Sequence, residues 1–147
     1  MDDSVFSFSS VDDCRIITLP RNSHENGSLS VIGNDGSFPF TVKRVYYLYD
    51  IPGDAERGGH AHRDNRSLII AVSGCFDVTL DDGHQKRTFT LNRPYNALYV
   101  PAGLWREIRN FSSGSVCLVL TSESYSEDDY VRDYAHFIDL TREKTAR

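Results

Sequence analysis

Cysteine is scarce in this sequence, and long apolar runs are absent. The three cysteines, Cys14, Cys75 and Cys117, are far apart, odd in number and without Cys-x-x-Cys spacing, which argues against a disulfide framework. We therefore expect free thiols and a reducing compartment, the cytoplasm. No apolar run approaches the roughly 20 residues that a membrane-spanning helix requires, so we expect no membrane association.

An excess of positive charge is also missing. Lysine and arginine number 16 against 21 aspartates and glutamates, which gives a net charge of -5. Proteins that bind nucleic acids generally present a basic surface, so we expect no such partner. The start, MDDSVFSFSS, lacks the basic region and apolar run of a signal peptide. A length of 147 residues predicts one domain over 1–147.

What is present is mostly alternation of apolar and polar residues, which predicts an all-β protein. The expected strands are Cys14–Leu19, Phe40–Tyr49, Ser67–Val72, Phe76–Leu80, Gln85–Leu91, Ala97–Val100, Arg106–Phe111 and Val116–Ser122. Ser67–Val72 is apolar on both faces, as a buried strand would be. Short turns with glycine or proline separate the runs, including the hairpin signal Asp81-Asp82-Gly83. Many short strands joined in this way indicate an antiparallel sandwich or barrel.

Only the C-terminal tail has helical spacing, and it predicts a short helix between about 127 and 143. The residues that can share one face of this helix are Tyr130, Tyr134, Phe137 and Ile138. The acidic run Glu127-Asp128-Asp129 is interpreted as its solvated start. Residues 1–10 and 22–37 have the composition of loops, with an N-terminal strand that pairs elsewhere as the alternative. The expected domain core is thus about 38–124, followed by a helical tail at about 125–143.

The strongest chemical signal is the segment Arg57-Gly58-Gly59-His60-Ala61-His62. On a strand, His60 and His62 point to the same face. The two glycines allow a bulge or a close approach beside them. Imidazoles titrate near neutrality and can take and return a proton. A same-face histidine pair after a glycine turn favours a functional site over a structural role.

The segment resembles the first motif of the cupin superfamily, in which two histidines, a glutamate and a later histidine hold a metal. Arg66 and Ser67 stand where the glutamate belongs, and neither can replace it. The second cupin motif, P-x-G-x-x-H-x-x-x-N, matches Pro101–Asn110 except that Arg106 replaces the ligand histidine. Arginine offers no lone pair and repels a cation, so we expect no metal and no other cofactor. The resemblance implies an all-β cupin jelly roll with a short C-terminal helix.

A closer resemblance, from Arg44 to Phe137, is to the sugar-nucleotide 3,4-ketoisomerase branch of the cupins. The matching segments are Arg44–Tyr47, Arg57–His62, Leu80–Gly83, Leu91–Pro94, Leu98–Pro101, Trp105, Leu118–Leu120, Ser124-Tyr125 and Asp129–Tyr134. One departure is Ser67, where the family usually carries glutamine. The resemblance implies an isomerase that moves the keto group of a dTDP-4-keto-6-deoxy sugar from C4 to C3 through an enediolate. The product serves dTDP-3-amino sugars of surface glycans such as lipopolysaccharide O-antigens and S-layer glycans.

The same resemblance implies roles for individual residues. His60 and His62 are the expected proton-transfer pair, with His60 as the main base. Arg44 and Arg57 are expected to position the sugar nucleotide or to steady the enediolate. Tyr46 lies on the strand face of Arg44 and is a candidate for proton relay, with a core aromatic as the alternative.

Two further candidates belong to the second motif. Arg106, at the position of the lost ligand, is expected to face the cavity and bind substrate. Trp105 is expected either to stack on the base or sugar or simply to pack. The family also implies a homodimer, often formed by exchange of N-terminal strands.

Three other functions stay open at this point. A metal-dependent cupin oxygenase is opposed by the lost glutamate and by Arg106. A non-catalytic cupin that binds sugar nucleotides fits the arginines equally well. A dTDP-sugar 3,5-epimerase uses similar proton chemistry on the same fold. The C4 configuration of the product and the exact nucleotide also stay open.

Overall fold

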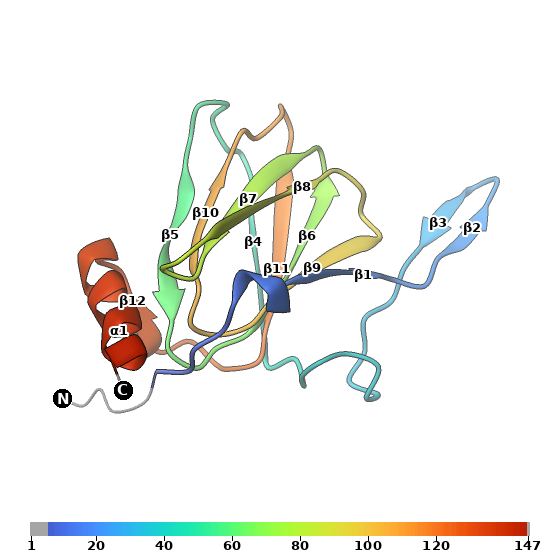
Figure 1. The fold of residues 1–147 in the computed structure, drawn as a ribbon. Helices are drawn as coiled ribbons and strands as arrows, with labels where there is room; N and C mark the ends of the chain where they lie inside the picture. The colour runs from blue at the N-terminus through green and yellow to red at the C-terminus, as the bar shows by residue number, and fades with distance from the viewer. Residues whose placement is uncertain (1–5, 147) are drawn as a thin grey trace.

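The computed structural model describes residues 6–146, which form two antiparallel sheets packed face to face, a projecting hairpin and one helix (Figure 1). The first sheet has the order β1 (Arg15–Thr18), β9 (Asn96–Val100), β6 (Ser67–Ser73), β11 (Val116–Thr121), β4 (Arg44–Leu48). The second has the order β12 (Tyr130–Val131), β5 (Arg57–His62), β10 (Trp105–Arg109), β7 (Phe76–Asp81), β8 (Lys86–Leu91). The predicted all-β jelly roll of the cupin type, with a short C-terminal helix, is confirmed.

The inner faces of the two sheets form the main core, because alternate residues of every long strand point inward. Its fully buried side chains include Ile69, Phe76, Val78, Leu98 and Val119. This interior is apolar at one end. At the other end the inward positions are His60 and Arg106, which face each other across β5 and β10.

The outer face of the first sheet carries a second apolar cluster. Leu68 and Ile70 point outward from β6 and are covered by Leu19 and Phe40 of the segment that follows β1. This cover explains why β6 is apolar on both faces, as the sequence predicted. A third cluster joins helix α1 (Tyr134–Ala146) to the outside of the second sheet. Within the described residues, no helix has the length and apolar character needed to cross a membrane.

The strand expected at Phe40–Tyr49 is shorter than predicted and begins only at Arg44. The reason is Asn34, whose side chain accepts a hydrogen bond from the Val42 N–H and donates one to the Val42 carbonyl. The backbone of Val42 is therefore engaged by a side chain and does not join the ladder. At the other end, Asp50 adopts a φ of 53° and turns the chain out of the sheet.

The prediction of a loop at 22–37 was wrong in its first part. Strands β2 (Asn22–His24) and β3 (Gly27–Leu29) pair as a two-stranded hairpin that projects from the body of the molecule (Figure 1). All six of its strand residues are exposed, so the alternation that marks a half-buried strand is missing. Of the loop predicted at 1–10, residues 1–5 lie outside the described residues.

The tail also differs from its prediction. Glu127–Asp129 form a short 3₁₀ turn (η2), Tyr130–Val131 add β12 to the edge of β5, and the helix begins only at Tyr134. Tyr130 pairs with His62 in this ladder and does not share a helix face with Tyr134. The helix begins only at Tyr134, because Tyr130 and Val131 before it pair with the free edge of β5.

Candidate active site

A cavity of about 360 Å³ opens at the polar end of the barrel. Its floor consists of apolar side chains, among them Leu48, Ile69, Ile108 and Val119. Its polar wall consists of Arg44, Tyr46, Arg57, His60, Arg106, Tyr130 and Arg132. These residues come from β4, β5, β10 and the segment around β12, so strands far apart in the sequence build one site. A concave, largely preformed pocket with a few converging polar groups is the usual form of a small-molecule site.

Gly58 shapes the wall of this cavity. Its φ of 97° lies in the region that favours glycine, and a Cβ there would come within 3.2 Å of the Arg106 carbonyl oxygen. The pairing of β5 with β10 shifts register at the same place, between Arg106 and Ile108. This bulge lets Arg57 and His60 both line the cavity although they are three residues apart.

His60 and His62 lie side by side, as the same-face spacing predicted. Their ring centroids are 4.8 Å apart and the rings are nearly perpendicular. The ring of Tyr130 contacts both, at 5.0 Å from His60 and 4.5 Å from His62. The Nε2 atoms of both imidazoles are buried and have no hydrogen-bond partner among the described residues. Two unpartnered nitrogen atoms therefore remain for proton transfer.

Both imidazoles are held neutral. Burial lowers the pKa of His60 to about 2, and the positive charge of Arg106 adds to that effect. Burial also lowers the pKa of His62 to about 4, although its hydrogen bond to Asp129 opposes the shift. At neutral pH each ring consequently has a lone pair available as a base.

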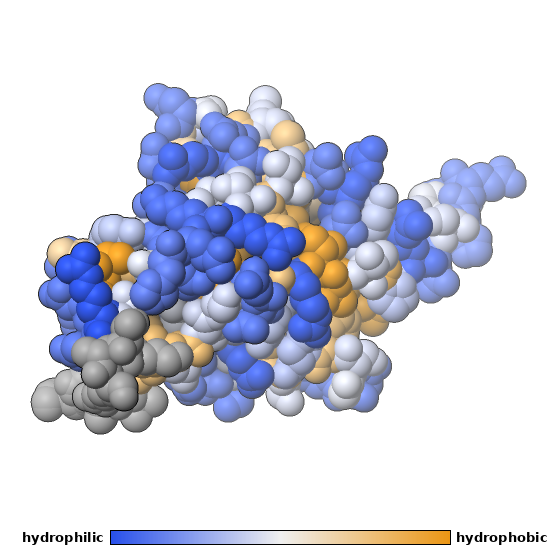
Figure 2. All heavy atoms as spheres, in the orientation of Figure 1, coloured by the Kyte–Doolittle hydropathy of each residue, from blue (hydrophilic) through white to orange (hydrophobic). Residues whose placement is uncertain are grey.

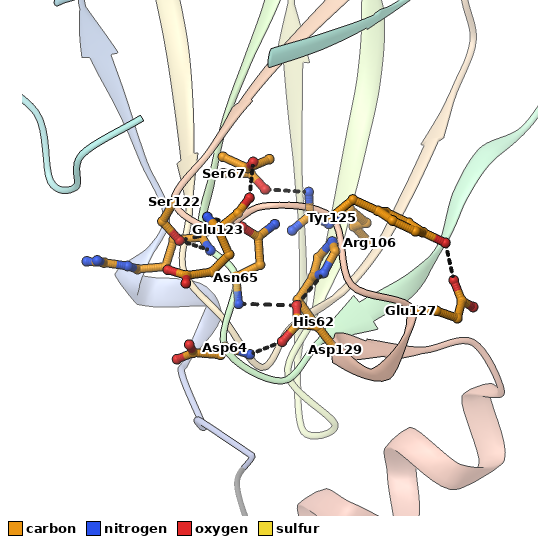
Figure 3. Close-up of polar contacts among 12 residues, drawn as sticks. His62, Asp64, Asn65, Ser67, Arg106, Ser122, Glu123, Tyr125, Glu127 and Asp129 are labelled. Carbon is orange, nitrogen blue, oxygen red and sulfur yellow. Dashed lines mark hydrogen bonds and ion pairs between the residues drawn. The ribbon is translucent and has the colours of Figure 1, made fainter. Parts of the chain in front are cut away.

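Arg106 is the fixed cation of the site, and the structure places it in the cavity as predicted. It is almost completely buried, and its Nη1 donates a hydrogen bond of 3.0 Å to the hydroxyl of Ser67 (Figure 3). Its Nε and Nη2 are buried without a partner among the described residues. A buried guanidinium with unused N–H groups is a strong site for an oxyanion, because leaving those donors unpaired is costly.

The remaining cationic side chains stand around this centre. The guanidinium of Arg44 lies 4.7 Å from the ring centroid of Tyr46 and 5.0 Å from that of Tyr125. Arg57 lines the same cavity from β5. Burial raises the pKa of the Tyr46 hydroxyl, so it stays protonated and can donate a hydrogen bond into the cavity.

Trp105 is the predicted binding residue that the structure does not bring to this cavity. Because neighbouring residues of a strand point to opposite faces, Arg106 faces inward and Trp105 outward. The indole packs edge-on against Tyr134 and near Phe137, and its Nε1 donates a hydrogen bond of 3.2 Å to Glu107. Trp105 thus anchors helix α1, which corresponds to the packing alternative.

Sequence reasoning missed three residues of the site: Asp129, Tyr130 and Arg132. Asp129 was interpreted as a solvated helix start, but its carboxylate is bound to His62 Nδ1 at 2.9 Å. The Arg132 guanidinium lies 4.2 Å from the centroid of the Tyr130 ring and pairs with Glu127. The available signal was the match of the tail to the ketoisomerase family, which identifies the segment without giving the roles of its residues.

The metal site of cupins is not supported by the residues present. The guanidinium of Arg106 lies beside His60 and His62, and it lowers the pKa of both imidazoles by its charge. No group of three or more histidines, cysteines, aspartates or glutamates within residues 6–146 is arranged to hold a metal ion. Two imidazoles beside a fixed cation are a poor donor set for a divalent ion.

A larger groove of about 490 Å³ lies on the outer face of the first sheet. Its lining is mostly apolar and hydroxylic, with Arg21 as its charged residue and no histidine. A third hollow, beside Asp82 and His84, is larger still, at about 530 Å³, so size alone does not identify the active site. The smaller cavity brings together His60, Tyr46 and Arg106, whose pKa values are all displaced by burial, and we therefore take it as the active-site candidate.

Comparisons with known proteins identify the family of the chain. The family described as "FdtA: WxcM-like, C-terminal" matches residues 12–142. The TDP-4-oxo-6-deoxy-α-D-glucose-3,4-oxoisomerase of Aneurinibacillus thermoaerophilus is 38% identical over 123 residues, which are 84% of this chain and 88% of that protein. A 3,4-ketoisomerase from Helicobacter canadensis superposes with a TM-score of 0.85 at 38% identity, over 88% of this chain and 98% of that one. The sugar 3,4-ketoisomerase QdtA from Thermoanaerobacterium thermosaccharolyticum, solved with TDP, superposes with a TM-score of 0.88 at 32% identity, over 92% and 98% of the two chains.

Proposed function

Since the chain belongs to the FdtA family, we propose that it is a 3,4-ketoisomerase that moves the keto group of a TDP-4-keto-6-deoxy sugar from C4 to C3. The observation that carries this proposal is the pairing of a neutral imidazole, His60, with the buried guanidinium of Arg106 in one cavity, with the second neutral imidazole, His62, against His60. A base and a fixed cation side by side suit a reaction that creates an anion by removing a proton from carbon.

In the first step, His60 removes the proton from C3 of the sugar. The electrons of the C–H bond form the C3–C4 double bond, and the C4 ketone oxygen becomes negatively charged. His60 is a weak base in the empty cavity. Negative charge that develops on the bound substrate raises the pKa of the ring and strengthens it as a base when it is needed.

Arg106 stabilises the enediolate that results. Its unpartnered Nε and Nη2 donate to the negatively charged oxygen in a site where low polarity strengthens the interaction. The Ser67 hydroxyl accepts a hydrogen bond from Nη1 of the same guanidinium, so the unpartnered Nε and Nη2 groups keep a fixed direction.

The second step returns a proton to C4 and leaves the ketone at C3. The hydroxyl proton on O3 has to leave while O4 gains one, and the Tyr46 hydroxyl at the cavity wall is the proposed relay between them. The imidazolium gives its proton to C4, which restores the neutral histidine. Substrate and product have the same composition, so the cycle requires neither an oxidant nor a cofactor.

We assign the diphosphate of the substrate to the arginines at the cavity wall. Arg44 and Arg57 line the cavity, and guanidinium groups bind phosphate oxygens through paired hydrogen bonds. The net charge of -5 is thus compatible with an anionic substrate because the basic groups are concentrated at one place.

The proposed setting is the cytoplasm, where the three free cysteines would stay reduced. The proposed use of the product is the synthesis of TDP-3-amino sugars for surface glycans, because a C3 ketone is the group that an aminating enzyme converts to an amine.

The proposed assembly is a homodimer built through the β2–β3 hairpin. This hairpin extends away from the body, and Figure 2 places apolar surface on the body next to its base. Leu29 and Val31 at the hairpin are 55% and 56% exposed. An isolated hairpin of this size is marginal in water, so packing on a second copy would stabilise it. Sedimentation analysis tests this: Leu29→Asp should shift a dimer to monomers.

The activity is tested by proton NMR of the protein with TDP-4-keto-6-deoxyglucose in deuterated water. Appearance of a 3-keto product with deuterium at C4 supports the proposal, and the C4 coupling constants give the configuration of the product. Exchange at C3 and C5 without migration of the ketone would make the protein a 3,5-epimerase instead. Binding of TDP without any exchange would indicate a non-catalytic cupin.

A further inference from the structure

Asp129 occupies an unusual position for a residue in an acidic run. It closes the 3₁₀ turn η2 immediately before β12, beside Asp128, whose side chain is exposed. The side chain of Asp129 is only 15% exposed and points back toward β5 (Figure 3). A carboxylate in such a place needs donors to compensate for lost hydration.

The structure provides these donors. The backbone N–H of Asp64 donates to Oδ1 at 2.8 Å, and that of Asn65 donates to Oδ2 at 3.3 Å. The carbonyl of Asp129 accepts a hydrogen bond of 2.8 Å from the N–H of Arg63. Burial by itself raises the pKa of this carboxyl, but the hydrogen bonds from His62 and Asp64 outweigh it, and the net shift is downward. Asp129 is therefore an ionised, immobile acceptor.

Asn65 extends this support to the next segment. Its buried side chain accepts hydrogen bonds from the N–H of Glu123 at 3.0 Å and from the Ser122 hydroxyl at 3.5 Å. The β5–β6 turn that donates to Asp129 is thus itself fixed at both ends. The geometry of the carboxylate does not depend on the exposed residues of the acidic run.

An ionised carboxylate only accepts hydrogen bonds, so the nitrogen of His62 that faces it must carry a proton. That nitrogen is Nδ1, at 2.9 Å from Oδ2. A neutral imidazole has one N–H, so Nε2 of His62 is a bare acceptor. This Nε2 is buried without a partner among the described residues, in a ring that contacts His60 edge-on.

We propose that Asp129 is a positioning residue of the ketoisomerase reaction, which fixes His62 in the Nδ1–H tautomer and stabilises the imidazolium that forms when its Nε2 accepts a proton. This inference rests on the proposed function of the cavity. It assigns the two imidazoles different duties: His60 lines the cavity and meets the substrate, whereas His62 is the ring with a carboxylate to balance a positive charge. In this scheme His60 takes the proton from C3 and passes it to Nε2 of the adjacent His62. Nε2 returns the proton to His60 in the second half of the reaction, and His60 delivers it to C4, so no net proton is gained or lost.

The test combines a spectroscopic signature with kinetics on the full chain. Long-range ¹H–¹⁵N correlation spectra, with His62 assigned by loss of its signals in His62→Gln, distinguish a protonated from a bare ring nitrogen. We expect protonated Nδ1 and bare Nε2 in the parent protein. In Asp129→Asn the amide donates to Nδ1, so the pattern should reverse. The control is Asp128→Asn, which removes the adjacent exposed carboxylate and should leave the spectrum unchanged.

The kinetic arm uses the same variants with TDP-4-keto-6-deoxyglucose. A wrong tautomer at a catalytic imidazole lowers turnover by orders of magnitude. For Asp129→Asn we expect kcat to fall by roughly 10²- to 10⁴-fold with KM changed by less than about threefold. Asp128→Asn should stay within about twofold of the parent in both constants.

The outcomes separate this inference from the proposed function. An unprotonated Nδ1 of His62 in the parent protein overturns the inference. The spectra of the parent protein therefore decide the inference even where Asp129→Asn does not fold. Unchanged kcat in Asp129→Asn, or loss of kcat with an unchanged tautomer, also overturns it. A parent protein that turns over no keto sugar would refute the proposed function, while the spectra would still decide whether Asp129 sets the tautomer.

Discussion

The two ends of the barrel interior have the same backbone architecture and opposite chemistry. At one end, Phe76 and Phe111 pack with ring centroids 5.3 Å apart among fully buried aliphatic side chains. At the other end, His60, His62 and Arg106 occupy equivalent inward positions of neighbouring strands, and four of their nitrogen atoms have no partner among the described residues. Unsatisfied buried groups cost stability, so the polar end is retained for chemistry while the apolar end holds the fold together.

The sharpest way to test this division is to remove the base at the polar end. His60→Asn should lower turnover by about 10²- to 10⁴-fold, because proton transfer by a positioned side chain contributes that much. The free energy of unfolding should not decrease, because a buried imidazole without a partner for Nε2 does not stabilise the fold. Single-turnover kinetics and urea denaturation measure the two quantities.

The control for this variant is His136→Asn, an exposed histidine on α1. It should leave turnover and stability unchanged. Comparable turnover in His60→Asn and in the parent protein would mean that the base lies elsewhere.

The opposite experiment removes packing at the apolar end. Phe76 is 1% exposed, and Phe76→Ala should lower the free energy of unfolding by about 3–5 kcal/mol through lost burial and the cavity left behind. Turnover per folded molecule should stay within about twofold, because Phe76 does not line the site cavity. A loss of turnover as large as that of His60→Asn would show that the two ends are not independent.

The contrast also explains how much the sequence could predict. The apolar end follows a period of two, so its strands and buried residues could be identified from pattern alone, and Asp81-Asp82-Gly83 marked its hairpin. His60 and His62 could be found because alternation along a strand places them on one face. Arg57 and Arg106 could be found only from the resemblance to family motifs, because the bulge that brings Arg57 to the cavity leaves no such pattern. The prediction that Trp105 binds substrate was inconsistent with the same prediction for Arg106, because adjacent residues of a strand cannot both face the cavity.

The tail could not be predicted in the same way. Asp129 and Tyr130 reach the site because two residues, Tyr130–Val131, pair with the edge of β5 more than 60 positions earlier in the chain. Such a contact leaves no local periodicity in the sequence. The helical spacing that begins at Tyr134 extends backward by chance through Tyr130, and it concealed the strand.

Replacing the buried charge at the polar end by an apolar side chain should lower turnover without lowering the free energy of unfolding. Arg106→Met keeps the side chain long and removes a charge whose pKa is lowered by burial. We expect turnover to fall by roughly 10²- to 10³-fold, as when an oxyanion donor is lost. The free energy of unfolding should stay equal or rise by about 1–4 kcal/mol, since replacing a buried charge by an apolar side chain is often stabilising. Denaturant titration that gives a less stable variant would contradict this account.

The smallest expected effect is a pH dependence that only the polar end produces. His62 has a pKa of about 4 in the folded protein and about 6.5 when unfolded. Between these values the unfolded state binds the proton and the folded state does not, so the free energy of unfolding decreases as the pH falls from 6.5 to 4. For His62, which is 3% exposed, the decrease amounts to about 3 kcal/mol over this window. The pKa of Asp129 is lowered from 3.8, so protonation of this carboxylate decreases the free energy of unfolding only below this pH range. His60, whose pKa is lowered to about 2, contributes a decrease of the same sign over this window. His62→Gln should therefore remove the His62 part of the dependence measured by denaturant titration at a series of pH values and leave the His60 part, whereas His136→Gln should leave the whole dependence unchanged. An equal slope in the parent protein and His62→Gln would mean that burial does not hold this imidazole neutral, and the polar end would then be no less tolerant of acid than the apolar end.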